Sequence, residues 1–133
     1  MNIKTRLNNL KYFDTKLNSL RQERIALRAT VQKAQIYSDE PKGSKQGNKT
    51  EDLNVRIISK SEQIDKEMER LWDERNETAQ AIESLEDPLE NVIMRWYYIN
   101  GCSRFEVMRK VNCSRTTFHR VKKSAIEHLE AKL

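Results

Sequence analysis

The apolar residues between positions 10 and 34 recur alternately every three and every four positions. This is the spacing of the a and d positions of a heptad, which places a narrow apolar stripe along one side of an α-helix. Such a stripe is buried against another helix, so the spacing predicts a long helix that pairs in a coiled coil. The stripe positions are Leu10, Phe13, Leu17, Leu20, Arg24, Leu27, Val31 and Ala34.

A second, weaker heptad pattern predicts another long helix between residues 57 and 85. Polar residues in such a stripe fix the register or the number of partners at some loss of stability. The stripe positions are Ile57, Ser61, Ile64, Met68, Leu71, Arg75, Thr78, Ile82 and Leu85. Residues 38–50, between the two patterns, have the Gly, Pro and polar content of a flexible linker, and we expect them to be the most mobile part of the chain.

The linker is too short for the two helices to pair in parallel within one chain. Each helix is expected to be about 55 Å long at about 1.5 Å per residue, whereas the linker spans at most about 45 Å. The helices therefore pair either as an antiparallel hairpin within the chain or between chains. We favour the antiparallel coiled-coil hairpin, with homodimerisation through the same region.

The distribution of charge supports this division of the chain. Residues 1–37 contain eight basic and two acidic residues, and residues 51–87 contain five basic and twelve acidic ones. Residues 88–133 contain nine basic and four acidic residues and so carry the whole net charge of +5. Opposite charges suit two helices that pack together, and a concentrated positive charge is typical of a module that binds a polyanion.

Composition excludes several classes of protein. Only 37% of the residues are hydrophobic and 34% are charged, which leaves too little apolar sequence for one thick core. Lys4, Arg6 and Lys11 interrupt the apolar residues at the start, so we expect neither a signal peptide nor a membrane span. Cys102 and Cys113 form no C-x-x-C pair, which fits a reducing compartment. We therefore expect a soluble cytoplasmic protein.

Residues 88–133 are predicted to form a separate domain of short helices after a hairpin domain at residues 1–87. Asp87 is a favourable N-cap and Pro88 a favourable first helical residue, and Asn100–Gly101 is a favourable helix end. The inward residues of this first short helix are expected to be Leu89, Val92, Ile93, Trp96 and Ile99.

Two further caps predict a helix-turn-helix in this domain. Ser103 with Glu106 forms a capping box that opens one helix, Asn112–Cys113 makes a turn, and Ser114 caps the last helix. The expected buried residues are Phe105, Met108 and Val111 in the first helix and Phe118, Val121, Ala125 and Leu129 in the second. A second helix that projects in this way can enter the major groove of DNA.

The residues that face away from this predicted core can form hydrogen bonds. Between positions 104 and 123 there are seven basic residues and one acidic residue, enough positive charge to neutralise several phosphates. We predict contacts to base edges or nearby phosphates by Arg115, Thr116, His119 and Arg120. We predict phosphate contacts by Lys110, Lys122 and Lys123, and we also assign Arg104 to the DNA-binding surface.

Two groups of residues allow a metal-binding interpretation, which we weigh against an ordinary structural one. The acidic group lacks an accompanying Glu-x-x-His and is better explained as a solvated helix face paired with cations. The group of Cys and His matches no usual zinc-finger spacing, and small buried cysteines in turns explain it better. The groups are Glu67, Glu69, Asp73, Glu74 and Glu77, and Cys102, Cys113, His119 and His128.

Other features argue against catalysis and against single-strand binding. Trp96, Tyr97 and Tyr98 suit stacking on nucleotide bases, but Trp96 falls on the predicted apolar stripe and core packing is favoured. The three glycines form no loop that cradles phosphates, and no acid, base and nucleophile occur at a recognisable spacing. We therefore expect no enzymatic activity, no cofactor and no bound metal.

The stretch from Leu85 to Leu129 resembles a known class of helix-turn-helix. It contains MRWYYINGCSRFEV followed by CSRTTFHRV, and it is similar to the fourth-region helix-turn-helix of bacterial sigma factors. The chain as a whole is similar to the RinA and ArpU group of late transcriptional activators from phages of Gram-positive bacteria. It differs from that group at Met108, where the family pattern generally has a small residue.

The resemblance implies a sequence-specific DNA-binding protein that activates phage late genes together with the host RNA polymerase. Two alternatives remain. A small terminase subunit, which acts as a DNA-packaging adaptor, also joins a helix-turn-helix to coiled-coil helices, but it forms large rings. A protein-interaction module would use its coiled coil to bind a partner and its basic end only for solubility.

Overall fold

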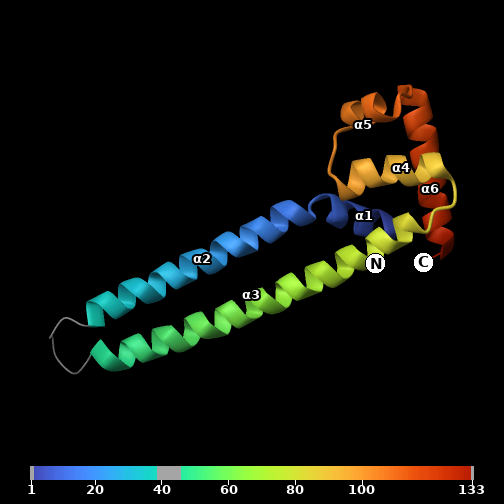
Figure 1. The fold of residues 1–133 in the computed structure, drawn as a ribbon. Helices are drawn as coiled ribbons and strands as arrows, with labels where there is room; N and C mark the ends of the chain where they lie inside the picture. The colour runs from blue at the N-terminus through green and yellow to red at the C-terminus, as the bar shows by residue number, and fades with distance from the viewer. Residues whose placement is uncertain (1, 39–45, 133) are drawn as a thin grey trace. The chain divides into compact units, whose positions relative to one another are not determined.

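A computed structural model describes residues 2–38 and 46–132, which are almost entirely helical and contain no strand. The elements in chain order are α1 (Ile3–Lys11), α2 (Phe13–Ser38), α3 (Gln46–Glu83), α4 (Pro88–Met94), the π-helical segment η1 (Arg95–Ile99), α5 (Arg104–Val111) and α6 (Arg115–Lys132) (Figure 1). The predicted all-α class is therefore confirmed.

The helix boundaries differ from the prediction at two places. The first long helix is interrupted at Tyr12, where α1 ends and α2 begins. The second begins at Gln46, so that residues 46–50 of the predicted linker are helical. Residues 39–45 of that linker, for which high mobility is expected, lie outside the described residues.

By their internal contacts, the residues form two compact units. One consists of Met1–Asp14 together with Trp72–Leu133, and the other is Thr15–Leu71. The sequence suggested a boundary after residue 87, but residues 1–14 and 72–87 belong to the same unit as α4, α5 and α6. Coiled-coil spacing continues across Asp14 and Leu71, so the pattern of apolar residues gave no sign of this boundary.

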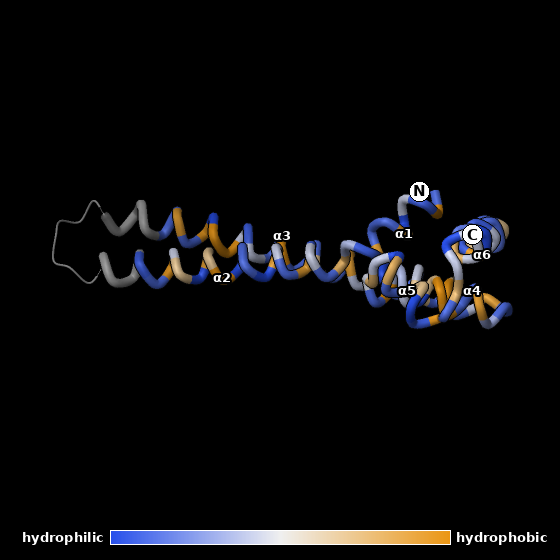
Figure 2. The backbone as a smooth tube through the Cα atoms, turned by 90° about the horizontal axis from the view of Figure 1, so that it is seen from above, coloured by the Kyte–Doolittle hydropathy of each residue, from blue (hydrophilic) through white to orange (hydrophobic). Residues whose placement is uncertain are grey.

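The unit Thr15–Leu71 contains parts of α2 and α3, which run antiparallel beside each other (Figure 1). Hydrophobic positions recur along both helices between hydrophilic ones (Figure 2). Leu17, Ile57, Ile64 and Leu71 are buried, and all four are predicted stripe positions. The remaining stripe positions in this unit that have described side chains are half-buried: Leu20, Arg24, Leu27, Val31, Ser61 and Met68. The side chain of Ala34 lies outside the described residues.

Ion pairs connect α2 to α3 within this unit. The side chains of Arg24 and Asp65 approach to 3.0 Å and those of Lys16 and Glu67 to 3.5 Å. Glu67 also accepts hydrogen bonds from Arg70, and these bonds, with the positive charges of Arg70 and Lys16, hold the pKa of its carboxyl below the ordinary value. Because these pairs are largely exposed, each contributes about 0 to 1 kcal/mol and favours the register more than the stability.

The unit formed by Met1–Asp14 and Trp72–Leu133 contains two apolar clusters. In the first, Ile3, Leu7 and Leu10 of α1 are buried with residues from the end of α3, the α4–η1 region and α6. Those residues are Ile82, Leu85, Met94, Tyr98, Ala125 and Leu129. The second cluster consists of Ile93, Val107, Phe118 and Val121 from α4, α5 and α6. Helix α6 contributes to both clusters and therefore connects α1 with α4 and α5.

The end of α3 is held by side chains from later in the sequence. The amide group of Asn91 donates hydrogen bonds to the backbone carbonyls of Ile82, Glu83 and Leu85, at 3.3 to 3.4 Å. Lys132 donates to the backbone carbonyl of Ser84 at 2.7 Å. The last carbonyl groups of a helix have no partner within the helix, so these bonds satisfy acceptors that would otherwise need water.

Two predicted core positions are wrong. Val92 is 40% exposed and Phe105 is 65% exposed. The buried face of α4 instead contains Glu90, Ile93 and Met94, and Tyr98 is the buried residue of the π-helical segment that follows. In α5 the buried residue is Val107, which lies on the side of the helix opposite to Phe105.

Candidate nucleic-acid interface

A short turn joins α5 to α6. Ser103 caps α5 by accepting a hydrogen bond from the backbone N–H of Glu106 at 3.2 Å, and α5 ends at Asn112, which has a φ of 56°. Asn tolerates this left-handed conformation better than most residues do, so the chain reverses here at little cost. Ser114 then accepts from the backbone N–H of Thr117 at 3.2 Å and caps α6. The predicted caps at Ser103 and Ser114 are confirmed, as is the cap at Asp87.

Helix α6 divides into a buried face and an exposed one. Phe118, Val121, Ala125 and Leu129 are buried, as their spacing predicts. On the other side, five of the eight predicted DNA-binding residues lie exposed along the first two and a half turns. These residues are Arg115, Thr116, His119, Arg120 and Lys123. The structure thus brings together cationic and hydrogen-bonding side chains on a solvent-facing surface, which we call the α6 face.

The other three predicted residues contact aromatic rings. The Nζ of Lys110 lies 4.5 Å from the centre of the Trp96 ring, and the Nζ of Lys122 lies 4.7 Å from that of Tyr97. The guanidinium of Arg104 lies 4.9 Å from the Phe105 ring. Cation–π contacts of this kind are worth about 0.5 to 1 kcal/mol at exposed sites, so the rings restrict where these three charges point. Sequence spacing did not reveal these contacts.

The Nε of Arg104 is buried and has no hydrogen-bond partner among the described residues. The residue as a whole is half-buried, and its guanidinium leans against an exposed phenylalanine. An unpaired buried N–H group is costly unless something supplies an acceptor. Arg104 is therefore the predicted site residue that would gain most from a hydrogen-bond acceptor on a bound ligand.

The aromatic residues of η1 are part of the fold. Tyr97 packs edge-to-face on Tyr98 and on Phe118, with ring centres 4.8 and 5.5 Å apart. Burial raises the pKa of Tyr97, but a hydrogen bond from Lys11 and nearby positive charges, including that of Lys122, outweigh it and lower the pKa overall. Trp96 and Tyr97 also pack against the second apolar cluster. These contacts support the core-packing interpretation over stacking on bases.

The natural chain is expected to lose stability at alkaline pH because of Tyr98, and the Tyr98→Phe variant is expected to avoid this loss. Burial raises the pKa of Tyr98 from its ordinary value of 10.0 to about 12. Between these values the unfolded chain releases the phenolic proton while the folded chain keeps it, so the free energy of unfolding falls as the pH rises. The full effect is about 2 to 3 kcal/mol.

The measurement is urea unfolding of the natural chain and of Tyr98→Phe at about pH 8 and again near pH 12. Between about pH 8 and about pH 12 the free energy of unfolding should fall more for the natural chain than for Tyr98→Phe. Tyr12→Phe, at a residue that is 63% exposed, is the matched control and should show no such shift. An equal shift for both variants would contradict the assignment to Tyr98.

Sequence reasoning missed a buried polar cluster that joins α4 to α6. Glu90 is only 4% exposed, and its carboxylate accepts a hydrogen bond from Ser124 at 2.7 Å and contacts the Nδ1 of His128 at 2.9 Å. Ser124 and His128 are one helical turn apart on α6, so both reach the same carboxylate. The cluster fixes how α6 lies on α4 and therefore how the α6 face is presented.

The two groups that allowed a metal-binding interpretation do not assemble into a site in the described parts of the chain. There, no three or more His, Cys, Asp and Glu side chains are placed to hold a metal ion. Cys102 and Cys113 are half-buried free thiols packed against the second apolar cluster. Burial raises the pKa of Cys102, and the hydrogen bond and negative charge of Glu106 raise it further.

The described helices also include none with the length and hydrophobicity needed to cross a membrane.

Comparison with known proteins identifies a family. Neither the curated proteins nor the solved structures contain a match to this chain. The family model described as "Protein of unknown function (DUF1492)" matches residues 30–130, which include the end of α2, all of α3 to α5 and nearly all of α6. That match covers well over half of the sequence, and the chain therefore belongs to the DUF1492 family.

Proposed function

We propose that this protein binds double-stranded DNA through α5 and α6, which act as a helix-turn-helix with α6 as the recognition helix. The observation that carries the proposal is the α6 face, where five polar or cationic residues are exposed opposite a fully apolar buried face. In helix-turn-helix proteins, residues near the start of the second helix contact base edges in the major groove. The α6 face lies in this part of α6.

The residues of the site have two roles in this proposal. Arg115, Thr116, His119 and Arg120 contact base edges or the phosphates next to them, since Arg and polar side chains can read the hydrogen-bonding pattern of the major groove. Lys110, Lys122, Lys123 and Arg104 contact backbone phosphates. The first set provides sequence specificity, and the second provides affinity that weakens with salt.

We further propose that the protein is a transcriptional regulator, an activator of phage late genes that works with the host RNA polymerase in the bacterial cytoplasm. This role rests on the resemblance to the RinA and ArpU group and to the fourth region of sigma factors. The antiparallel parts of α2 and α3, with their buried heptad positions, support a coiled-coil hairpin, through which two chains associate. In this role the protein has no enzymatic activity.

Solution mass separates this proposal from the packaging alternative. A dimer is expected for the regulator, because two helix-turn-helix units bind two half-sites more tightly than one unit binds a single site. Light scattering coupled to size-exclusion chromatography gives the mass. A ring of about eight or nine chains would favour the small terminase function instead.

DNA binding itself is tested by selection and titration. Fragments retained by the protein from phage and host genomic DNA are sequenced to find the preferred site, and mobility-shift titrations then compare that site with random DNA at two salt concentrations. Arg115→Ala and Arg120→Ala should each weaken binding to the preferred site by about 5- to 150-fold, or about 1 to 3 kcal/mol, with smaller losses on random DNA.

Arg28→Ala is the matched control, because it removes the same charge from an exposed position on α2. It should leave the affinity for the preferred site nearly unchanged. Equal losses on preferred and random DNA would show that Arg115 and Arg120 contact only phosphates. No binding to any fragment at low salt would contradict the proposed function and leave the protein-interaction alternative.

A further inference from the structure

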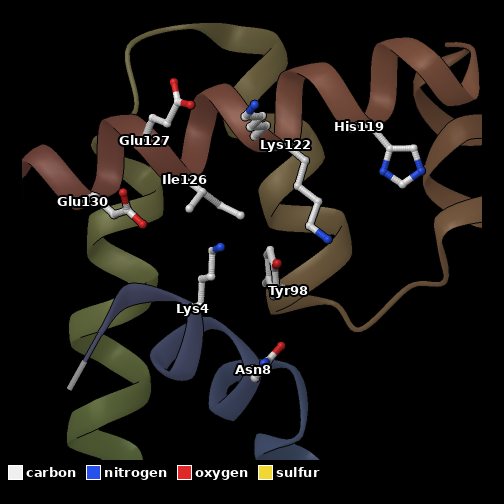
Figure 3. A pocket seen from close by; sticks show the side chains of 9 residues that line it. Lys4, Asn8, Tyr98, His119, Lys122, Ile126, Glu127 and Glu130 are labelled. Atoms are coloured by element: carbon white, nitrogen blue, oxygen red, sulfur yellow. The ribbon is translucent and has the colours of Figure 1, made fainter.

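A groove of about 550 Å³ lies between α1 and α6, beside the α6 face (Figure 3). Lys4 and Asn8 line it from α1, Tyr98 lines it from η1, and Lys122 and Lys123 line it from α6. In Figure 3 the side chains of Lys4 and Lys122 point into the space between the two helices, and the end of Lys4 lies below Ile126, between Glu130 and Lys122. His119 and Lys123 also belong to the α6 face, so the groove and that face share residues.

The apolar packing of α1 explains why Lys4 reaches the groove. Ile3 and Leu7, one turn apart, are buried in the first apolar cluster with Tyr98 and residues of α6. Lys4 and Asn8 each follow one of these buried residues, so they lie on the neighbouring stripe of α1, at the edge of the cluster. A lysine at this position is thus fixed close to α6 although nearly the whole chain separates the two in sequence.

The cations of the groove have no anionic partner among the described residues. No ion pair is found there for Lys4, Lys122 or Lys123, whereas other lysines, such as Lys16 and Lys60, have carboxylate partners. The Nζ of Lys122 is held over the rings of Tyr97 and Tyr98, at 4.7 and 5.8 Å. The rings position this charge without neutralising it.

The charge of the groove changes along α6. His119, Lys122 and Lys123 lie toward the start of the helix, and Glu127 and Glu130 lie one to two turns later. An anion is therefore attracted to the end of the groove that adjoins the α6 face and is repelled from the other end. That cationic end is also where the path of a DNA backbone beside α6 would pass under the proposed function.

We propose that Lys4 of α1, together with Lys122 and Lys123 of α6, binds a backbone phosphate of DNA in this groove, between Lys4 and the cationic end. The inference rests on the proposed function, and it adds the first helix of the chain, outside the helix-turn-helix, to the DNA interface. The lysine ammonium is a compact charge on a flexible stem and suits a phosphate contact that does not depend on base sequence. Asn8 offers an amide donor beside it.

The test is the salt dependence of DNA binding by Lys4→Gln. Each neutralised phosphate contributes about 0.9 to the slope of log affinity against log salt concentration, so this variant should reduce the slope by about one. Its loss of affinity should be the same on preferred and on random DNA. Lys66→Gln is the matched control, since it removes the same charge from an exposed position on α3, and its slope should equal that of the natural chain.

The outcomes separate this inference from the proposed function. If Arg115→Ala weakens specific binding while Lys4→Gln keeps the natural slope, the phosphate site is wrong and the proposed function stands. If the natural chain binds no DNA, both are overturned. In that case NMR titration with inorganic tripolyphosphate shows whether the groove takes a free phosphate ligand, through shifts at the amides of Lys4 and Lys122. Thermal unfolding followed by circular dichroism should show the same midpoint for all the variants.

Discussion

Phe118→Ala is expected to lower the free energy of unfolding by about 3 to 5 kcal/mol. The ring of Phe118 is 1% exposed and belongs to the second apolar cluster, where it packs edge-to-face on Tyr97 at 5.5 Å. Its removal leaves a cavity between α4, α5 and α6, and close-packed neighbours refill such a cavity only in part. Because this cluster holds α5 against α6, DNA binding should weaken together with stability.

Phe105→Ala is the matched control for this prediction. It makes the same chemical change in the same unit, but Phe105 is 65% exposed. Its substitution should therefore lower the free energy of unfolding by no more than about 0.5 kcal/mol. Urea unfolding followed by circular dichroism compares the two variants. Similar losses at the two positions would contradict the assignment of Phe118 to the core and of Phe105 to the surface.

Glu90→Ala is expected to lower the free energy of unfolding by about 1 to 3 kcal/mol, because it removes the acceptor of a buried polar cluster. Ser124 is half-buried and loses its partner, while His128 is exposed enough to bind water instead. Most of the cost therefore comes from Ser124 and from the cavity left by the side chain. Glu90→Gln, which keeps the shape and one acceptor oxygen, should restore part of the loss.

The control for Glu90 is Glu77→Ala, at an exposed position of α3 in the same unit. Chemical denaturation should show a change within about 0.5 kcal/mol for this variant. A double-mutant cycle of Glu90→Ala with Ser124→Ala then gives the coupling between the two side chains. A coupling near zero would show that the contact at 2.7 Å contributes nothing to stability.

Local signals predicted much of the fold. The caps at Asp87, Ser103 and Ser114 depend on bonds within a few residues, so the sequence contains all the information they need. The buried face of α6 followed from the spacing of its apolar residues, because that helix is regular along its length. The residues of the α6 face were predicted for the same reason, since they occupy what remains of the helix surface.

Features that depend on distant parts of the chain were not predicted. The packing of α1 on α6 involves residues more than a hundred positions apart, which periodicity within one helix does not report. The heptad spacing also continues through Tyr12 and so did not indicate the break there. The buried face of the α4 region contains Glu90, Met94 and Tyr98, which were not among the predicted inward residues. A carboxylate such as Glu90 resembles a surface residue in sequence, because only its partners on α6 make its burial favourable.

The packing of α1 in the same unit as α6 has a consequence for how the protein is made. The ribosome synthesises α1 well before α6, yet Ile3, Leu7 and Leu10 are buried in a cluster that includes Ala125 and Leu129. The apolar side of α1 is therefore only partly covered until α6 has been synthesised. This unit completes its folding only after α6 has left the exit tunnel, and a chain terminated before α6 would expose part of that apolar side to chaperones and proteases.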